Sequence, residues 1–383
     1  MSKLPSFFMP AEWAPHARTI LAWPSLRNPT FLTSQSIAAA TDEISSIAEA
    51  VAQFEPVTLI VSRERLFAAQ ERFRNVSCKH KVQLHPVAGN GLNIWMRDIA
   101  PTFVVSSQRP GNSSEQVPQN SPLLRGVDFN FNGWGNRHPT ETCSALAQML
   151  LHDTHTERIR ASIVTEGGAL EVDGEGTLLA TESSMINENR NPGKTREDIE
   201  TELRHQLGIS KIVWVPGIRD AESTDCHIDA LVRFARPGFV LLSRPTGVRE
   251  GIWMRVYEET RDILRRSRDA RGRPIEIIDI PEPDLSRLDL GHDVLATVEN
   301  ADPLSPVMSY VNYYLPNDGV VVPQFGDEEA DDAAAEILQS VFGPTRQIVR
   351  VYIKELPMQG GGIHCATQQV PFHGLEGVKD GTL

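Results

Sequence analysis

Cys365 is the residue of this sequence that is best suited to act as a nucleophile. It follows three consecutive glycines in the segment Gln359-Gly360-Gly361-Gly362-Ile363-His364-Cys365-Ala366-Thr367-Gln368-Gln369. Glycines lack a Cβ atom, so a ligand or another stretch of backbone can approach this turn closely. A cysteine of this kind is a candidate nucleophile only if a histidine and carboxylates from elsewhere in the chain can reach it.

The pair His227 and Asp229 is the best candidate for the partners of Cys365. Residues two apart in a strand face the same way, so a strand here would place both side chains on one surface and Ile228 in the core. A lone histidine is more often structural than catalytic, but the carboxylate two positions away favours a functional interpretation. His364 is the weaker candidate base for Cys365, because adjacent residues of a strand point to opposite faces.

Four further residues are candidates for the walls of a pocket. Asp98 follows Arg97, a pairing that is most often a surface ion pair; the functional alternative makes Trp95 a wall and Asp98 an anchor. Glu166 precedes two glycines, which indicates either a hairpin turn with an exposed glutamate or a carboxylate in a roomy turn. Glu222, in the loop before His227, is a candidate for shaping the mouth of the pocket.

Acids around a catalytic cysteine indicate a cationic substrate. Asp98, Asp229 and Glu166 would repel the thiolate of Cys365 and raise its pKa above the reference value of roughly 8.5. A cation that fits between the acids would offset this repulsion. A guanidinium group is such a cation, because it is planar, permanently charged and matched to bidentate carboxylates.

Composition excludes several classes of function. A formal net charge of −13 disfavours nucleic acid and anionic membrane surfaces as partners. The four cysteines, Cys78, Cys143, Cys226 and Cys365, show no metal-binding spacing, so we expect free thiols in a reducing compartment and no metal. The sequence starts without a signal-peptide pattern, and no window approaches the roughly 18 apolar residues that span a bilayer. We therefore expect a cytoplasmic protein.

Periodicity predicts alternating strands and helices. Strands are expected at 19–24, 57–61, 81–85, 102–105, 126–131, 163–164, 178–180, 211–215, 227–234, 239–243, 275–280, 307–315, 319–322 and 347–352. Helices are expected at 35–53, 63–73, 140–152, 198–207, 255–266 and 328–341, with a turn at 133–135. Residues 106–122 are polar and aperiodic, which predicts an exposed, mobile insertion, and residues 374–383 are expected to be a loose tail.

The order strand, strand, helix, strand recurs about five times, with a period of roughly 60–75 residues. Asp98, Glu166 and His227 follow one another at about this interval, and Cys365 follows His227 at about twice the interval. One polar cluster per unit, with one unit skipped, is what a closed ring of modules around a shared pocket would give. The alternative is coincidence among a few selected residues. No change in composition divides the chain, so we expect one domain over residues 1–383.

The residues collected so far resemble the agmatine deiminase and bacterial-type peptidylarginine deiminase family. The resemblance covers most of the chain, through the motifs Met9-Pro10-Ala11-Glu12-Trp13, Leu21-Ala22-Trp23-Pro24, Trp95-Met96-Arg97-Asp98, Glu166-Gly167-Gly168, Asn187-Glu188-Asn189-Arg190-Asn191-Pro192, His227-Ile228-Asp229, Pro323-Gln324-Phe325-Gly326-Asp327 and Ile363-His364-Cys365-Ala366-Thr367-Gln368-Gln369. So many motifs in one order are highly specific.

The resemblance implies an α/β fold, the pentein five-bladed propeller. It implies a Cys365 nucleophile, His227 as acid and base, and Asp98 and Asp229 as guanidinium ligands, with no cofactor. Agmatine would be hydrolysed through a covalent thiouronium to N-carbamoylputrescine and ammonia, a step towards putrescine. The resemblance also implies a homodimer or larger homo-oligomer.

Alternatives of the same family are deimination of free or protein-bound arginine and a degenerate homologue that only binds a cation. An amidinotransferase would need an amine acceptor site, for which the sequence shows no sign. Family members usually carry other residues at five positions of this chain, namely Ala100, Ala169, Cys226, Ala230 and Gly362.

Overall fold

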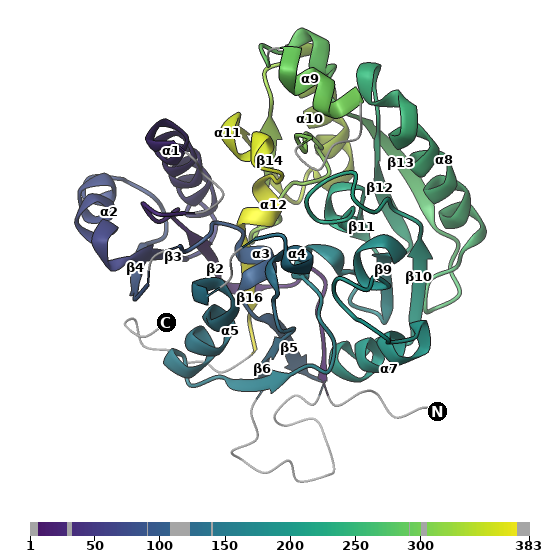
Figure 1. Cartoon of the computed structure of the whole chain (residues 1–383), viewed down its shortest axis with the longest axis horizontal. Coiled ribbons are helices and arrows are strands. Elements are labelled where there is room, and N and C mark those ends of the chain that lie inside the picture. The colour runs from purple at the N-terminus through teal and green to yellow at the C-terminus, as the bar shows by residue number, and fades with distance from the viewer. Residues whose placement is uncertain are drawn as a thin grey trace.

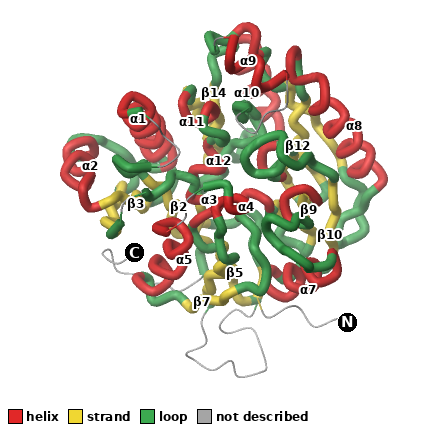
Figure 2. Tube along the Cα trace, viewed as in Figure 1, coloured by secondary structure: helices red, strands yellow, loops and turns green. Residues whose placement is uncertain are grey.

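The structure is a computed structural model with a mixed α/β fold, and it describes residues 7–28, 33–89, 91–107, 123–138, 141–290, 292–299 and 305–373. Longer helices lie around the outside, while the short helical turns α3 (Met96–Ile99), α4 (Gly133–Asn136) and α12 (Ile363–Ala366) lie near the middle (Figure 1). Much of the chain around these central turns is loop rather than helix or strand (Figure 2).

The strands of the described residues form five small sheets. The first two have the orders β1-β5-β6-β7 and β10-β9-β8, from β1 (Phe7–Phe8), β5 (Thr102–Ser106), β6 (Leu124–Asp128), β7 (Glu157–Arg160), β8 (Glu171–Val172), β9 (Thr177–Thr181) and β10 (Lys211–Val215). The other three have the orders β11-β12-β13, β14-β15 and β16-β2-β3-β4, from β2 (His16–Ala22), β3 (Val57–Ser62), β4 (Val82–Val87), β11 (Val232–Arg236), β12 (Phe239–Arg244), β13 (Glu276–Pro281), β14 (Gly319–Gln324), β15 (Gln347–Tyr352) and β16 (Gln368–Pro371).

The remaining helices mostly connect these strands. The α-helices are α1 (Ser34–Val51), α2 (Leu66–Phe73), α5 (Glu141–Asp153), α6 (Glu182–Met185), α7 (Arg196–Leu207), α8 (Glu250–Arg266), α9 (His292–Glu299), α10 (Glu328–Phe342) and α11 (Glu355–Met358). Short 3-10 helices are η1 (Arg63–Arg65), η2 (Gly167–Ala169), η3 (Ile228–Ala230), η4 (Gly247–Arg249) and η5 (Leu285–Arg287). Thr195 caps α7 through a reciprocal capping box with Asp198, which fixes where that helix begins.

Each sheet repeats the predicted order of strand, strand, helix, strand. An antiparallel pair is followed by a helix and a parallel third strand in β5-β6-α5-β7, β8-β9-α7-β10 and β11-β12-α8-β13. Strands β14 and β15 flank α10 in parallel, and a single antiparallel bridge from Tyr314 to Val321 replaces the missing first strand. In the fifth sheet β16 pairs antiparallel with β2, which α1 connects to the parallel β3, so the last described strand joins the sheet that begins near the N-terminus.

Three expected strands are wrong. Residues 163–164 are not a strand; the third strand of that sheet is β7, nearer α5. The segment 227–234 begins with η3 and becomes a strand only at Val232, and 307–315 contributes only the bridge at Tyr314. The predicted turn at 133–135 is present as α4, whose four residues all have positive φ, from 53° to 79°, and β16 was not predicted. Most of 106–122, and all of 374–383, lie outside the described residues.

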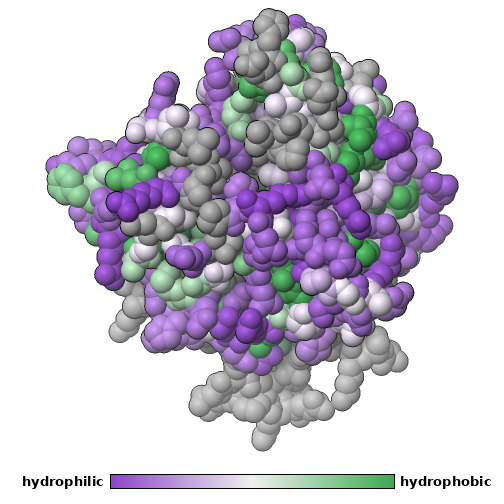
Figure 3. Space-filling model, in the orientation of Figure 1, coloured by the Kyte–Doolittle hydropathy of each residue, from purple (hydrophilic) through white to green (hydrophobic). Residues whose placement is uncertain are grey.

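Buried apolar side chains hold the helices against the sheets. Strand β3 is buried along its whole length, with Leu59, Ile60 and Val61 fully enclosed, and Ile44 and Ile47 of α1 belong to the same core cluster. The α1 residues recur at helical spacing, which is why the pattern at 35–53 predicted this helix correctly. On the face shown in Figure 3, hydrophobic residues appear only in separate small groups on a largely hydrophilic surface.

Candidate functional site

A pocket of about 660 Å³, continuous with solvent, brings together residues from distant parts of the chain. Its polar lining includes Cys365, His227, Asp229 and Glu222. An apolar part of the wall consists of Leu231, Pro245, Trp253, Pro306, Val307 and Met308. Three of the four predicted catalytic side chains therefore share one cavity.

The site residues share one position in the repeated module. Asp98 lies in α3 just before β5, Glu166 precedes η2 and β8, Asp229 lies in η3 before β11, and Cys365 lies in α12 before β16. A short helical turn before the first strand thus presents one polar side chain from each of these modules. This common position explains the regular spacing seen in the sequence.

Cys365 is presented by the turn α12, not by the strand end that the sequence suggested. Two glycines before it allow close packing: a Cβ on Gly361 would lie 2.6 Å from the Trp95 ring, and one on Gly362 would lie 2.6 Å from Asn312 Oδ1. Real Cβ atoms essentially never approach so closely. A larger residue at position 362 would therefore collide with Asn312 in this chain.

Asn312 is a site residue that the sequence analysis missed. Its Nδ2 lies 3.3 Å from Cys365 Sγ, and its Oδ1 accepts hydrogen bonds from the backbone N–H of His364 at 3.0 Å. It precedes the bridge at Tyr314, so it belongs to the one module that the predicted spacing skipped. A single amide within the apolar run 307–315 was the signal that could have identified it.

His227 directly precedes η3 and Asp229 is its second residue. The strand expected to place both side chains on one face is therefore absent at these two residues. Ile228 is fully buried in the core, as expected. The preceding residues Asp225 and Cys226 have φ of 63° and 71°, the left-handed region that favours glycine. The loop reaches the site through this tight turn rather than through an extended strand.

Gly168 marks the point where three of the predicted side chains converge. A Cβ on this glycine would lie 2.6 Å from His227 Nδ1, 2.9 Å from Asp98 Oδ1 and 3.2 Å from Asp229 Oδ2. The backbone N–H of Gly168 donates to Asp98 Oδ1 at 2.9 Å, and Trp134 Nε1 donates to Asp98 Oδ2 at 2.9 Å. Trp134 is a second residue that the sequence analysis did not identify.

Glu166 is fully buried and shared between two cations. Its Oε1 lies 3.1 Å from Arg190 Nε, and its Oε2 lies 3.3 Å from His227 Nε2. Arg190 also pairs with the buried carboxylate of Asp225, which anchors the loop that carries His227. The exposed hairpin considered for Glu166 is therefore wrong, and its carboxylate orients the histidine.

The remaining predicted binding residues are placed as follows. Trp95 is buried and packs on the glycine turn, and it is not among the residues that line the pocket. Glu222 does line the pocket, but its carboxylate accepts hydrogen bonds from the backbone of its own loop at Thr224 and Cys226. Arg97 does not pair with Asp98; it is buried and its Nη2 lies 3.1 Å from Glu12.

The carboxylates set the charge states of the site. Burial raises the pKa of Cys365, and the charges of Asp229 and Asp98 raise it further, well above its usual value. Burial would lower the pKa of His227, but Asp98 and Glu166 outweigh it and raise the pKa to about 9. At neutral pH the unliganded site therefore holds a thiol beside an imidazolium.

The same environment shifts the pKa values of two of the carboxylates in opposite directions. Burial raises the pKa of Asp98 to about 6, with Asp229 adding to the effect against the opposing charge of His227. Burial would also raise the pKa of Asp229, but its hydrogen bond from His364 outweighs this and lowers the pKa. Both are ionised above about pH 6, and together they form an anionic cradle beside the sulfur.

Comparisons with known proteins identify the family of this chain. Residues 8–371 match the family described as Porphyromonas-type peptidyl-arginine deiminase, and the chain belongs to this family. It is 34% identical to an agmatine deiminase of Stutzerimonas stutzeri over 376 residues, 95% of each chain. It is also 34% identical to an agmatine deiminase of Medicago truncatula over 379 residues, 95% of this chain and 96% of that one.

Solved structures show the same fold. The agmatine deiminase of Enterococcus faecalis superposes with a TM-score of 0.80 at 30% identity, over 96% of each chain. An amidinotransferase of Microseira wollei, only 12% identical, superposes with a TM-score of 0.52 over 97% of this chain and 98% of that one. These structural neighbours place the mixed α/β fold in the pentein superfamily.

Two properties of the described residues bear on other classes of function. No helix among them is both long enough and apolar enough to cross a membrane. Within the same part of the chain, no three His, Cys, Asp or Glu side chains are grouped as metal ligands.

Proposed function

We propose that this protein is an agmatine deiminase, a hydrolase that converts the guanidinium of agmatine to a ureido group and releases ammonia. The observation that carries the proposal is the convergence of Asp98, Asp229 and His227 around the bare Cα of Gly168, with Cys365 Sγ 3.5 Å from Asp229. A planar cation between the two aspartates would compensate their charges and bring its central carbon to the sulfur. The agmatine deiminases among its relatives support agmatine as that cation.

In the first half of the reaction Cys365 acts as nucleophile and His227 as acid. The guanidinium neutralises Asp98 and Asp229, so the thiol loses its proton to solvent more readily. The thiolate adds to the central carbon and gives a neutral tetrahedral adduct. His227, already an imidazolium, protonates one amino group, which leaves as ammonia and yields a cationic S-alkylthiouronium.

In the second half His227 acts as base. Now neutral, it takes a proton from a water molecule whose oxygen adds to the thiouronium carbon. The new adduct expels the Cys365 thiolate and loses a proton to become the ureido product. Glu166 holds His227 by its Nε2 throughout, as a positioning residue rather than a ligand of the substrate.

The rest of the pocket suits the chain of agmatine. The apolar wall around Trp253 and Met308 can contact four methylene groups. Glu222 and Glu282 also line the pocket, and Arg249 lies 2.7 Å from Glu282. We propose that Glu222 shapes the end that receives the distal ammonium and that Trp95 contributes by fixing the turn before Cys365.

Ammonia release from agmatine, free arginine and a peptidyl-arginine substrate tests the proposal. Agmatine is expected to be the preferred substrate by kcat/KM. Preference for free arginine or for the peptide would instead identify the protein as a deiminase of that arginine substrate. Binding of agmatine by calorimetry without turnover of any of the three would identify a degenerate homologue.

We also propose that the five sheets are the blades of a closed five-bladed propeller that forms one domain over residues 1–383. The repeated module and the pairing of β16 with β2 support this closure. The homo-oligomeric state and the cytoplasmic location stay predictions.

Catalytic efficiency is expected to rise with pH and level off near pH 9. The reactive pair, thiolate and imidazolium, has one proton fewer than the thiol and imidazolium present at neutral pH. Therefore kcat/KM grows about tenfold per pH unit until His227, with a pKa raised to about 9, begins to titrate. Below about pH 6 protonation of Asp98 steepens the fall to about 100-fold per unit.

Initial rates at low agmatine concentration between pH 5 and pH 10 measure this profile. A maximum near pH 7 followed by a decline towards pH 9 would show that the unliganded site does not hold the thiol and imidazolium pair.

Gly168→Ala is expected to block guanidinium binding without unfolding the protein. The added methyl group would occupy the space between His227, Asp98 and Asp229, and the φ of Gly168 is compatible with alanine. We expect kcat/KM for agmatine to fall at least about 100-fold, since even a small misplacement of reacting groups has this effect. Gly251→Ala is the matched control, because no atom lies within 4 Å of its Cβ position. Unchanged activity of Gly168→Ala would place the guanidinium elsewhere.

A further inference from the structure

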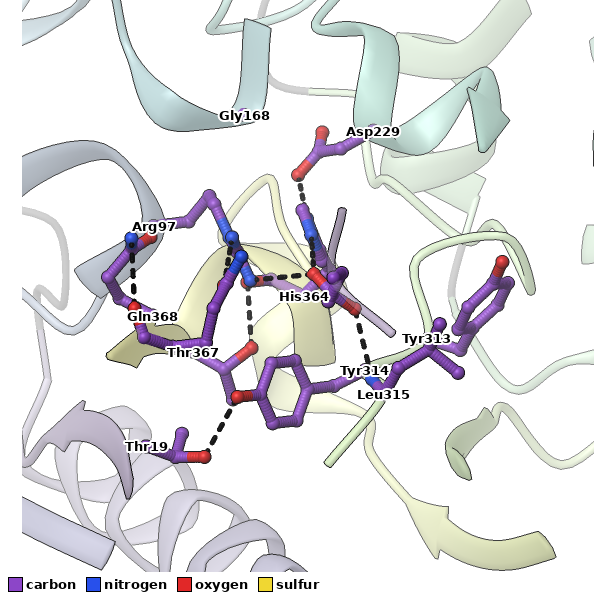
Figure 4. A network of polar contacts seen from close by, with 12 residues as sticks. Thr19, Arg97, Gly168, Asp229, Tyr313, Tyr314, Leu315, His364, Thr367 and Gln368 are labelled. Atoms are coloured by element: carbon purple, nitrogen blue, oxygen red, sulfur yellow. Dashed lines mark hydrogen bonds and ion pairs between the residues drawn. The ribbon is translucent and has the colours of Figure 1, made fainter. Parts of the chain in front are cut away.

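His364 lies next to the nucleophile in sequence, but both of its ring nitrogens contact buried carboxylates. Nδ1 lies 2.7 Å from Asp229 Oδ2, and Nε2 lies 2.7 Å from Glu12 Oε2. Figure 4 shows the imidazole of His364 aligned with the Asp229 carboxylate, with Arg97 on another side of the network. The imidazole is thus a bridge between two buried carboxylates.

Both carboxylates are ionised, so His364 must donate to each. Burial would raise the pKa of Glu12, but Arg233, His364 and Arg97 outweigh it and hold the pKa well below its usual value. The pKa of Asp229 is also lowered, against the effect of burial, chiefly by His364. An ionised carboxylate only accepts hydrogen bonds, so the donor in these contacts is a ring N–H of His364.

The two oxygens of Asp229 are in different situations. Oδ2 accepts from His364 and lies 3.5 Å from Cys365 Sγ, whereas Oδ1 is buried and has no hydrogen-bond partner. A buried carboxylate oxygen without a partner is costly unless a ligand supplies one. Because His364 holds Oδ2, the plane of the carboxylate is fixed, and Oδ1 is the oxygen left to accept a hydrogen bond from a ligand.

We propose that His364 is a positioning residue of the reaction proposed above: by donating to Asp229 and Glu12 at once, it orients the Asp229 carboxylate so that Oδ1 receives the substrate guanidinium. This inference rests on the proposed function and assigns a part of its binding machinery. Backbone bonds fix His364 itself, since its N–H donates to both Asn312 O and Asn312 Oδ1.

Removal of the His364 imidazole is expected to change the pKa of Asp229 in one direction. The other titratable groups that act on Asp229 are Cys365, His227, Asp98 and Arg233. Without His364, burial and the repulsion of Asp98 weigh more, so the pKa of Asp229 rises. The carboxyl group then takes up a proton at a higher pH, and its protonated form does not bind a guanidinium.

The test compares His364→Gln and His364→Ala with the wild type. Glutamine keeps one amide donor and similar volume but carries no charge. We expect KM for agmatine to rise about tenfold at pH 9 in His364→Gln, more in His364→Ala, with a smaller change in kcat. The pH below which KM increases is expected to move up by about one unit. His16→Gln is the matched control, because His16 is also buried and lies 3.2 Å from a carboxylate, that of Glu55.

The outcomes separate this inference from the proposed function. Wild-type turnover of agmatine tests the function, and the variants are measured against it. A folded His364→Gln protein whose KM stays within twofold of the wild type at every pH would overturn the inference. So would an equal loss at all pH values, since that is the signature of a purely structural role. Thermal melting establishes whether each variant is folded. If the alanine variant is unfolded, the glutamine variant alone decides the outcome.

Discussion

Cys365→Ala is expected to lower the rate of ammonia release from agmatine by at least about 10⁴-fold, because no other group can form the covalent intermediate. The fold should be retained. The turn that carries the cysteine is fixed by contacts that do not involve its sulfur, namely the packing of Gly361 on Trp95 and the backbone bonds to Asn312. A coupled assay for ammonia under saturating agmatine measures the effect.

Binding and a second cysteine provide the controls for this experiment. Agmatine should still bind to Cys365→Ala in calorimetry, since Asp98 and Asp229 are unchanged. Cys143→Ala is the matched substitution: Cys143 is buried in the core on α5 and is not part of the pocket lining. Residual turnover above about 1% in Cys365→Ala would contradict covalent catalysis by this residue.

Asp98→Asn is expected to lower kcat/KM for agmatine by about 10³-fold, which corresponds to a hydrogen-bonded charge pair lost from a buried site. Both oxygens of Asp98 accept from N–H donors, those of Gly168 and Trp134. An asparagine must therefore turn its own amide N–H groups towards one of these donors. The substitution removes the negative charge that pairs with the guanidinium, and it also disturbs the position of the side chain at residue 98.

The same substitution should have the opposite effect on the free thiol. Asp98 is one of the groups that raise the pKa of Cys365, so its neutralisation lowers that pKa. We expect iodoacetamide, a neutral reagent, to alkylate Cys365 faster in Asp98→Asn than in the wild type at pH 7. Slower alkylation together with slower turnover would indicate a collapsed pocket instead of a lost charge.

Asp173→Asn is the isosteric control for this prediction. Asp173 is equally buried, but a single oxygen, Oδ1, accepts both of its backbone hydrogen bonds, from Glu175 and Thr177. Its Oδ2 has no partner, so the amide group of asparagine can take that position. We expect turnover and alkylation within about twofold of the wild type, as is usual away from a functional site.

Residue types and their order were sufficient to predict the chemistry of the site. Cys365, His227 and Asp229 do line one pocket, and Asp98 lies 3.8 Å from His227. The argument that acids around a sulfur need a cationic guest depends on charge alone, so it required no coordinates. The repeated module was also predictable without coordinates, because hydrophobic periodicity is a local property of the chain.

Local geometry was predicted less well at the site itself. The sequence favoured strands at 227–234 and 307–315. The structure has η3 before the strand that begins at Val232 in the first segment, and the second segment is irregular. Packing around the pocket overrides β-propensity at these positions, since each segment must bend to present a polar side chain inwards. Asp225 and Cys226 in the left-handed region are the local result of that bend.

The sequence by itself predicted the nucleophile, its histidine, the two aspartates and the cationic class of substrate, because these predictions depend on residue types and motif order. Only the tertiary structure decided the partners that orient them. Asn312 reaches Cys365 across 53 residues of sequence, and Glu12 reaches His364 across 352. Such contacts depend on how distant modules meet, and no local pattern encodes that meeting. For the same physical reason the partnerless Oδ1 of Asp229, and the histidine that holds the other oxygen of this carboxylate, became visible only in the folded chain.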